Sequence, residues 1–272
     1  MRKNTNWLAT ALIALGSILI LFPLYMTVGI ALKNPEEMAQ SIFSLPTGLH
    51  FENFSNAIKA TDFFHALQNS AVITIVSVGF ILLTNSLVSY AIARNMNRRF
   101  FKLLYLYFVS AMFIPFQIIM LPVVKVTTDL GMNNIPGLIL LYIVYGLPFN
   151  VFVYVGYIRS IPLELEEAAT VDGTSTWGTF WKIIFPLLGP ISATIIILSS
   201  LSTWNDFLLP LILLADPSQY TLPLVQYVFQ GQFSTDFNLA FASYLLALLP
   251  MVVVYLSAQK WIISGITQGA IK

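Results

Sequence analysis

Residues 7–32 read WLATALIALGSILILFPLYMTVGIAL, a stretch without a charged side chain. A helix of about 20 apolar residues crosses the hydrocarbon layer of a membrane, and this stretch is longer. Met1-Arg2-Lys3 precede it. A secretory signal peptide has a shorter apolar region and a small-residue cleavage site. We therefore expect residues 7–32 to be a membrane-spanning helix retained in the mature protein.

The rest of the chain repeats this pattern. Soluble chains carry about a quarter charged residues, but here 9% are charged and 57% are hydrophobic. Backbone groups in hydrocarbon must bond within their own segment, which favours helices. The predicted fold class is all-α, a polytopic membrane protein with six transmembrane helices in a single transmembrane domain over 1–272. The six predicted spans are 7–32, 70–93, 103–124, 135–158, 184–214 and 239–263.

The distribution of Lys and Arg predicts the orientation, because these residues gather in cytoplasmic loops. With the N-terminus inside, only Lys33, Lys59 and Lys125 lie outside. Both termini are therefore predicted to be cytoplasmic. The basic residues then placed inside are Arg2, Lys3, Arg94, Arg98, Arg99, Lys102, Arg159, Lys182, Lys260 and Lys272.

The inner loop 159–183 predicts a short helix over about 163–173. Pro162 suits a first helical position, and Glu164, Glu166 and Glu167 suit the positive end of the helix dipole. Gly173 suits the stop. Leu165, Ala168 and Ala169 are expected on one face.

A second helix is expected to follow this loop helix. Thr174 or Ser175 is its predicted cap. Its apolar residues fall at helical spacing, so it is expected to lie along the membrane and turn inward near Pro186. Those residues are Trp177, Phe180, Trp181 and Ile184.

Two readings of the first loop helix remain open. Small alanines permit close approach to a partner, and carboxylates offer charge-assisted contacts to Arg or Lys. An ordinary helix at the membrane interface has the same periodicity.

The spacing in this loop resembles the EAA loop of bacterial ABC importer permeases. Glu167-Ala168-Ala169 is followed by Gly173 and then by Ile183 and Pro186. The family pattern ends Ile-x-Leu-Pro, whereas Phe185 precedes Pro186 here. The resemblance implies a coupling helix that docks into a cleft of a cytoplasmic ATPase, through Glu166, Glu167, Ala168, Ala169, Asp172, Gly173 and Pro186.

Other motifs are similar to the carbohydrate-uptake branch of that family. They are Asn69-Ser70, 90–94 (YAIAR), 114–117 (IPFQ), 204–207 (WNDF) and the tail 265–272 (GITQGAIK). The chain thus resembles the smaller, six-helix permease of a maltose-type sugar importer, with a type I ABC importer permease fold. The resemblance implies a second homologous permease, two ATPase subunits and an extracytoplasmic sugar-binding protein. It also implies the cytoplasmic membrane of a bacterium or archaeon.

Catalytic chemistry has no candidate residues in this sequence. No Lys follows a Gly, so the Gly-Lys of a phosphate-binding loop is missing. His50 and His65 are not spaced for zinc, and the chain has no cysteine. The net charge of +1 gives no case for nucleic acid. The chain is expected not to be an enzyme and to hold no metal or cofactor, with ATP and Mg²⁺ bound by partner ATPase subunits.

A substrate path is proposed from four polar or aromatic residues. Gln117 lies near mid-depth of the third span, beside Pro115, which can bend that span. Pore lining and an interhelical hydrogen bond are equally compatible with it. Trp204, Asn205 and Asp206 fall near the outer end of the fifth span, either lining an outer gate or ending the helix in water.

The predicted function is import of a mono-, di- or oligosaccharide into the cytoplasm by alternating access. An ABC permease for a non-sugar solute is one alternative, since the EAA loop alone does not separate solute classes. A secondary transporter driven by an ion gradient is a second, and a membrane-embedded scaffold is a third. The secondary transporter would need buried charges for ion coupling, and the spans contain almost none.

Overall fold

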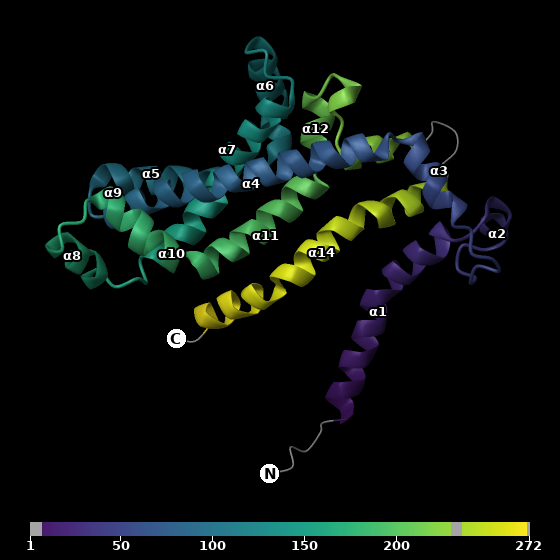
Figure 1. Ribbon diagram of the computed structural model, residues 1–272, viewed down its shortest axis with the longest axis horizontal. Coiled ribbons are helices and arrows are strands. Elements are labelled where there is room, and N and C mark those ends of the chain that lie inside the picture. Colours follow the sequence, from purple (N-terminus) through teal and green to yellow (C-terminus); the bar gives the residue numbers. More distant parts are fainter. Residues whose placement is uncertain (1–6, 230–235, 271–272) are drawn as a thin grey trace. The chain divides into compact units, whose positions relative to one another are not determined.

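The computed structural model describes residues 7–229 and 236–270, and their side chains as far as Ser257. Arg2, Lys3 and Lys272 lie outside the described residues, and the side chain of Lys260 is likewise outside them. Within the described part, all regular structure is helical (Figure 1). The longer helices are α1 (Trp7–Ala31), α4 (Phe63–Arg94), α5 (Arg99–Ala111), α6 (Phe116–Asp129), α7 (Ile135–Ile158), α11 (Gly189–Asn205) and α14 (Phe237–Ala270).

Shorter helices fill the connections. Two of them, α2 (Pro35–Gln40) and α3 (Glu52–Ala60), lie between α1 and α4. The loop after α7 holds α8 (Glu164–Val171), α9 (Thr176–Thr179), a π-helical turn (Phe180–Ile184) and α10 (Phe185–Leu187). Beyond α11 come α12 (Leu208–Leu213), two 3₁₀ turns (Pro217–Gln219 and Tyr227–Phe229) and α13 (Leu222–Gln226).

Four helices are long and apolar enough to cross a membrane: α1, α4, α7 and the Phe237–Ser257 part of α14. The third and fifth predicted spans instead fall on bent pairs of helices. If each pair makes one span, the described residues contain up to six. Length and composition therefore support the predicted polytopic architecture, with two of its spans broken.

The third span bends by 105° between α5 and α6. The predicted straight helix 103–124 is wrong in this respect, because residues 112–114 leave the helix and Pro115 stands at the N-cap position of α6. Proline cannot donate a backbone hydrogen bond, and it disfavours helical geometry in the residue before it. The same break was anticipated only as a bend at Pro115.

The fifth span is broken twice. Its first part, Thr176–Leu187, meets α11 at 73°, with Leu188 and Gly189 at the bend and Pro190 opening the new helix. The helix then ends at Asn205, and α12 begins at Leu208. The continuous helix expected over 184–214 is therefore three helical pieces.

The contacts divide the chain into two compact units, each described by itself. The first unit holds residues 1–66 and 224–251. Here the amide of Asn53 donates to the carbonyl oxygens of Ala31 (2.9 Å) and Lys33 (2.8 Å). The Asn238 amide donates to those of Ile30 (3.2 Å) and Lys33 (2.5 Å). These bonds tie the end of α1 to Asn53 on α3 and to Asn238 on α14.

The second unit holds residues 67–223 and 252–272. Its centre is α7, which packs against α5 and α11. Val151, Tyr154 and Ile158 on α7 are fully buried, and they share one apolar cluster with Ile184 and Ile195. This cluster fixes the loop after α7 to the spans.

We predict that Gly137→Ala destabilises the protein and that Gly156→Ala on the same helix does not. A Cβ at Gly137 would clash with the carbonyl oxygen of Met132, so the backbone must move, whereas nothing lies within 4 Å at Gly156. Overpacking of this kind costs about 1–3 kcal/mol. Thermal unfolding in detergent should show a lower midpoint for Gly137→Ala alone, and equal midpoints would contradict the close approach.

Candidate functional site

The loop after α7 forms the helix that its sequence predicts. Its α8 covers Glu164–Val171 and carries Glu164, Glu166 and Glu167 in its first turn. Gly173 ends it with φ of +79°, which side chains other than hydrogen disfavour. The Thr174 N–H then reaches the Ala169 carbonyl (2.9 Å), and the Gly173 N–H reaches that of Thr170 (3.0 Å), which closes the helix end.

The helix α8 has an inner and an outer face. Ala169 is 5% exposed and Glu166 is largely buried, so both face the rest of the chain. The other side is open, and Val171 is 88% exposed. Leu165, Ala168 and Ala169 were expected on one face, but Ala169 is buried while Leu165 and Ala168 are exposed. The predicted coupling residues Glu167, Ala168, Asp172 and Gly173 are exposed.

An ion pair ties α8 to the end of α4. The Arg94 Nε lies 2.6 Å from a Glu166 carboxylate oxygen, and both side chains are less than 15% exposed (14% for Glu166, 13% for Arg94). The Tyr90 hydroxyl donates to the other Glu166 oxygen (2.7 Å), and Arg94 Nη2 donates to the Ile161 carbonyl (3.2 Å). Glu166, predicted to face a partner, is thus occupied within its own chain.

Tyr90 and Arg94 were not predicted as functional residues. The available signal was charge, since a basic residue ends the second predicted span and acidic residues fill the loop between the fourth and fifth. Charge alone did not say which of the three glutamates would pair.

The second loop helix is capped by Ser175, whose hydroxyl accepts from the Gly178 N–H (3.2 Å). The expected membrane-facing stripe is only partly formed. Phe180 and Ile184 are buried in the protein, while Trp177 is 63% exposed. The π-helical turn inserts one extra residue per turn and so rotates the following side chains. Pro186 is exposed and lies two residues before the 73° bend.

Aromatic rings link this segment to α4. The Phe180 ring lies 5.2 Å from that of Tyr90 and 4.9 Å from that of Trp181, measured between centroids. Trp181 in turn contacts Phe185 at 5.1 Å. Tyr90 therefore touches both loop helices, α8 through its hydroxyl and the π turn through its ring.

Three of the four predicted path residues line one pocket of about 450 Å³. Gln117 comes from α6, and Asn205 and Asp206 come from the break after α11. Tyr142 and Tyr145 of α7 also line it. The fourth residue, Trp204, is 7% exposed and is not among the lining residues.

Asp206 lines this pocket and follows the last residue of α11, so both interpretations of it stay open. One carboxylate oxygen accepts from the Tyr142 hydroxyl (2.9 Å). The other accepts from the Leu208 N–H (3.1 Å) at the start of α12, where the chain breaks. It is a helix-end acid that also faces a pocket.

A second polar pocket of about 370 Å³ shares Tyr142, Tyr145 and Ser202 with the first. Asn150 and Gly146 of α7 also line it. Sequence reasoning missed this pocket, because its residues are scattered over α4, α7 and α11 without a local motif.

Two buried amides lie beside Gly146. Within the described part of the chain, Nδ2 of Asn85 and Nδ2 of Asn150 are buried without a hydrogen-bond partner. A Cβ at Gly146 would lie 3.5 Å and 3.0 Å from these nitrogens, so the missing side chain leaves room for both amides. Unsatisfied buried donors are rare and point to a bound polar group or water.

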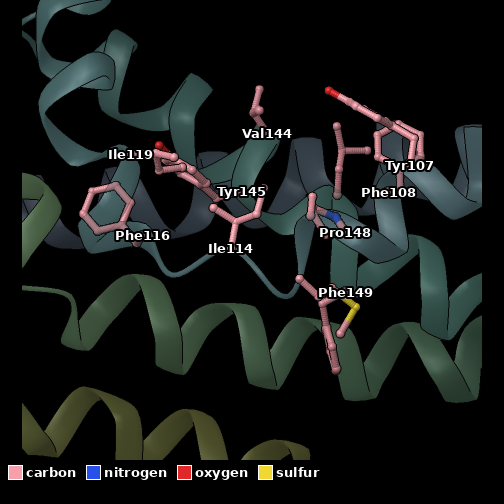
Figure 2. Close-up of a pocket in the computed structure, with 12 residues that line it drawn as sticks. Tyr107, Phe108, Ile114, Phe116, Ile119, Val144, Tyr145, Pro148 and Phe149 are labelled. Carbon is pink, nitrogen blue, oxygen red and sulfur yellow. The ribbon is translucent and has the colours of Figure 1, made fainter.

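A third pocket, of about 520 Å³, lies at the break between α5 and α6 (Figure 2). Tyr107 and Phe108 come from α5, and Tyr145 and Pro148 from α7. Its lining is mostly apolar, so it suits a hydroxyl-rich solute less than the two polar pockets do. The Phe116 and Tyr145 rings, 5.4 Å apart, stand where it meets the 450 Å³ pocket.

Pockets with polar side chains at the breaks in two spans, together with an exposed helix tied to the end of α4, indicate a membrane-embedded transport protein. Residues 85–268 match the model of the binding-protein-dependent transport system inner membrane component. The chain belongs to that family, and is therefore a multi-pass inner membrane permease subunit.

Relatives and solved structures agree with this assignment. The chain is 42% identical over 264 residues to the multiple sugar-binding transport system permease protein MsmG of Streptococcus mutans, covering 96% of this chain and 95% of that protein. It is 35% identical over 276 residues to the melibiose/raffinose/stachyose import permease protein MelC of Bacillus subtilis, covering 100% and 98%.

The fold is similar to a chain in the crystal structure of a bacterial ABC transporter involved in the import of the acidic polysaccharide alginate. The TM-score is 0.83 at 20% identity, covering 96% of this chain and 98% of that one. The predicted fold class, an all-helical polytopic ABC importer permease, is confirmed.

We predict that the Arg94–Glu166 pair behaves as a coupled unit. Arg94→Gln and Glu166→Gln each leave the other, largely buried charge without its ion-pair partner, so each should lower the thermal midpoint of unfolding. The double variant should lose less free energy of unfolding than the sum of the two single losses, with an interaction energy of about 0.5–3 kcal/mol. Arg98→Gln, at an exposed position next to α5, is the matched control and should be neutral. Strictly additive losses would contradict the pairing.

Proposed function

We propose that this chain is one of two homologous permeases of an ATP-driven sugar importer in a bacterial or archaeal cytoplasmic membrane. The observation that carries this is α8, a short helix whose inner face is tied to α4 and whose outer face is open. An outer face of Glu167, Ala168, Val171 and Asp172 suits a groove on a partner protein. Membership of a binding-protein-dependent family supports the rest of the assembly.

The partner of α8 is proposed to be a cytoplasmic ATPase. Two ATPase subunits would bind ATP and Mg²⁺ and supply the hydrolysis, for which this chain has no phosphate-binding loop. Closure of the ATPase pair would move α8, and α4 would follow because Arg94 and Tyr90 hold Glu166. The spans would then alternate between inward-facing and outward-facing states. Both termini of the chain would be cytoplasmic.

The solute is proposed to be a sugar delivered by an extracytoplasmic binding protein. The two polar pockets present tyrosine rings beside amides and hydroxyls, and a sugar offers both C–H faces and hydroxyl groups. The names of the two relatives support the same solute class. A wall built from aromatic faces and a few polar groups is typical of small-molecule sites.

Co-purification tests the assembly. The tagged chain, solubilised gently from its native membrane, should recover an ATPase with a phosphate-binding loop and a second permease. Glu167→Lys should recover less ATPase, because it reverses a charge on the open face of α8. Recovery of the chain alone, before and after cross-linking, would contradict the proposed assembly.

Transport kinetics test the path. Gln117→Ala should raise the KM for sugar uptake by about 2- to 10-fold, the equivalent of one hydrogen bond of about 0.5–1.5 kcal/mol. Ile118→Ala is the matched control, because Ile118 is 70% exposed and does not line the 450 Å³ pocket. Unchanged uptake in Gln117→Ala, measured in vesicles with the complete transporter, would remove Gln117 from the path.

A further inference from the structure

The loop between α2 and α3, residues 41–51, is folded over the end of α1 (Figure 1). The side chain of Lys33, which is fully buried, holds this loop in place. The Lys33 Nζ donates to the carbonyl oxygens of Ser41 (2.8 Å) and Ile42 (3.0 Å) and to the Ser44 hydroxyl (3.1 Å). Its three donors are all used, and the charge is enclosed by the loop.

A buried carboxylate holds the other half of the loop. Glu37 accepts from the Asn34 N–H (2.9 Å), the Thr47 N–H (2.6 Å) and the Thr47 hydroxyl. These bonds, the Thr47 hydroxyl first, lower the pKa of Glu37 to about 2. Its stabilisation is present above the ordinary carboxyl pKa and is lost only as the pH falls towards 2. The His50 N–H also bonds the Leu32 carbonyl (3.1 Å).

The charged groups of Lys33 and Glu37 lie beneath the loop, and the loop itself exposes apolar side chains. No charged residue occurs from Met38 to Leu49. Exposed apolar side chains gathered on one short loop mark an interaction surface. They are Ile42 (45% exposed), Phe43 (70%), Leu45 (68%), Leu49 (64%) and Phe51 (63%).

The depth of this surface follows from the length of α1. Its 25 residues extend about 37 Å at ~1.5 Å each. Trp7 begins the helix, and tryptophan favours the membrane–water interface. A hydrocarbon core of about 30 Å then ends some 7 Å before Ala31. The end of α1, and the loop bonded to it through Lys33, lies at the level of the lipid headgroups.

We propose that residues 42–51 form an anchor that inserts Phe43, Leu45 and neighbouring apolar side chains into the outer leaflet of the membrane. The surface is continuous with the spanning helix α1, and its exposed side chains from Ile42 to Leu49 carry no charge, while the exposed carboxylates of Glu36 and Glu52 lie at its edges. Apolar side chains at this depth bind the boundary between headgroups and acyl chains. The anchor holds the outer end of α1 and needs no assumption about the transported solute.

Spin labels test the anchor, and the absence of native cysteine makes single labels direct. Phe43→Cys and Leu45→Cys are labelled in the complete transporter, reconstituted into phosphatidylcholine–phosphatidylglycerol vesicles. Collision rates with oxygen, which concentrates in lipid, and with a water-soluble nickel chelate are compared. Glu36→Cys, exposed on α2, is the control expected in water.

The oxygen-to-nickel ratio is expected to be several-fold higher at positions 43 and 45 than at 36. A ratio at both positions equal to that at 36 overturns the anchor. Nickel accessibility that is high at 43 and 45 and falls only when the binding protein is added also overturns it, and assigns the loop to that protein. Labels at these exposed positions leave the buried Lys33 and Glu37 contacts intact, so either result reports on the native loop.

Discussion

The contact between Arg94 and Glu166 is the constraint on which the transport account depends. Helices as short as the eight-residue α8 are marginal in isolation. Tertiary contacts must hold it, and the largely buried ion pair, the Tyr90 hydroxyl and the burial of Ala169 supply them. The position of α8 is therefore set by the end of α4, so that force on one reaches the other.

The same contact starts a continuous physical route to the polar pockets. The ring of Tyr90 packs on Phe180, which begins the π-helical turn leading through the 73° bend into α11. The far end of α11 carries Asn205, and Asp206 follows it at the pocket wall. Broken helices make such a route useful, since pieces that meet at a bend can rotate against one another while each keeps its own hydrogen bonds.

The sequence predicted those features that depend on neighbouring residues in the chain. Apolar length identified the spans, and Gly173 marked the end of α8 because its left-handed backbone needs no distant partner. The angles between helices and the pairing of distant side chains could not be predicted from sequence. Pro115 and Pro186 marked places where the chain was expected to bend or turn, but hydrophobic periodicity does not report the angle between two helix axes, so the size of the 105° and 73° bends was not predicted. The neighbouring amides of Asn85 and Asn150 depend on how α4 meets α7, which no local pattern encodes.

Cross-linking from the open face of α8 tests the central claim most directly. Ala168→Cys or Val171→Cys, in a chain without other cysteines, is treated with a short thiol–amine cross-linker in the assembled transporter. Ser55→Cys on α3, which the proposed orientation places on the opposite side of the membrane, is the control. The account predicts a product with the ATPase from both α8 positions, changed in yield by ATP, and none from Ser55→Cys. Efficient labelling of both α8 cysteines without any ATPase product would contradict it.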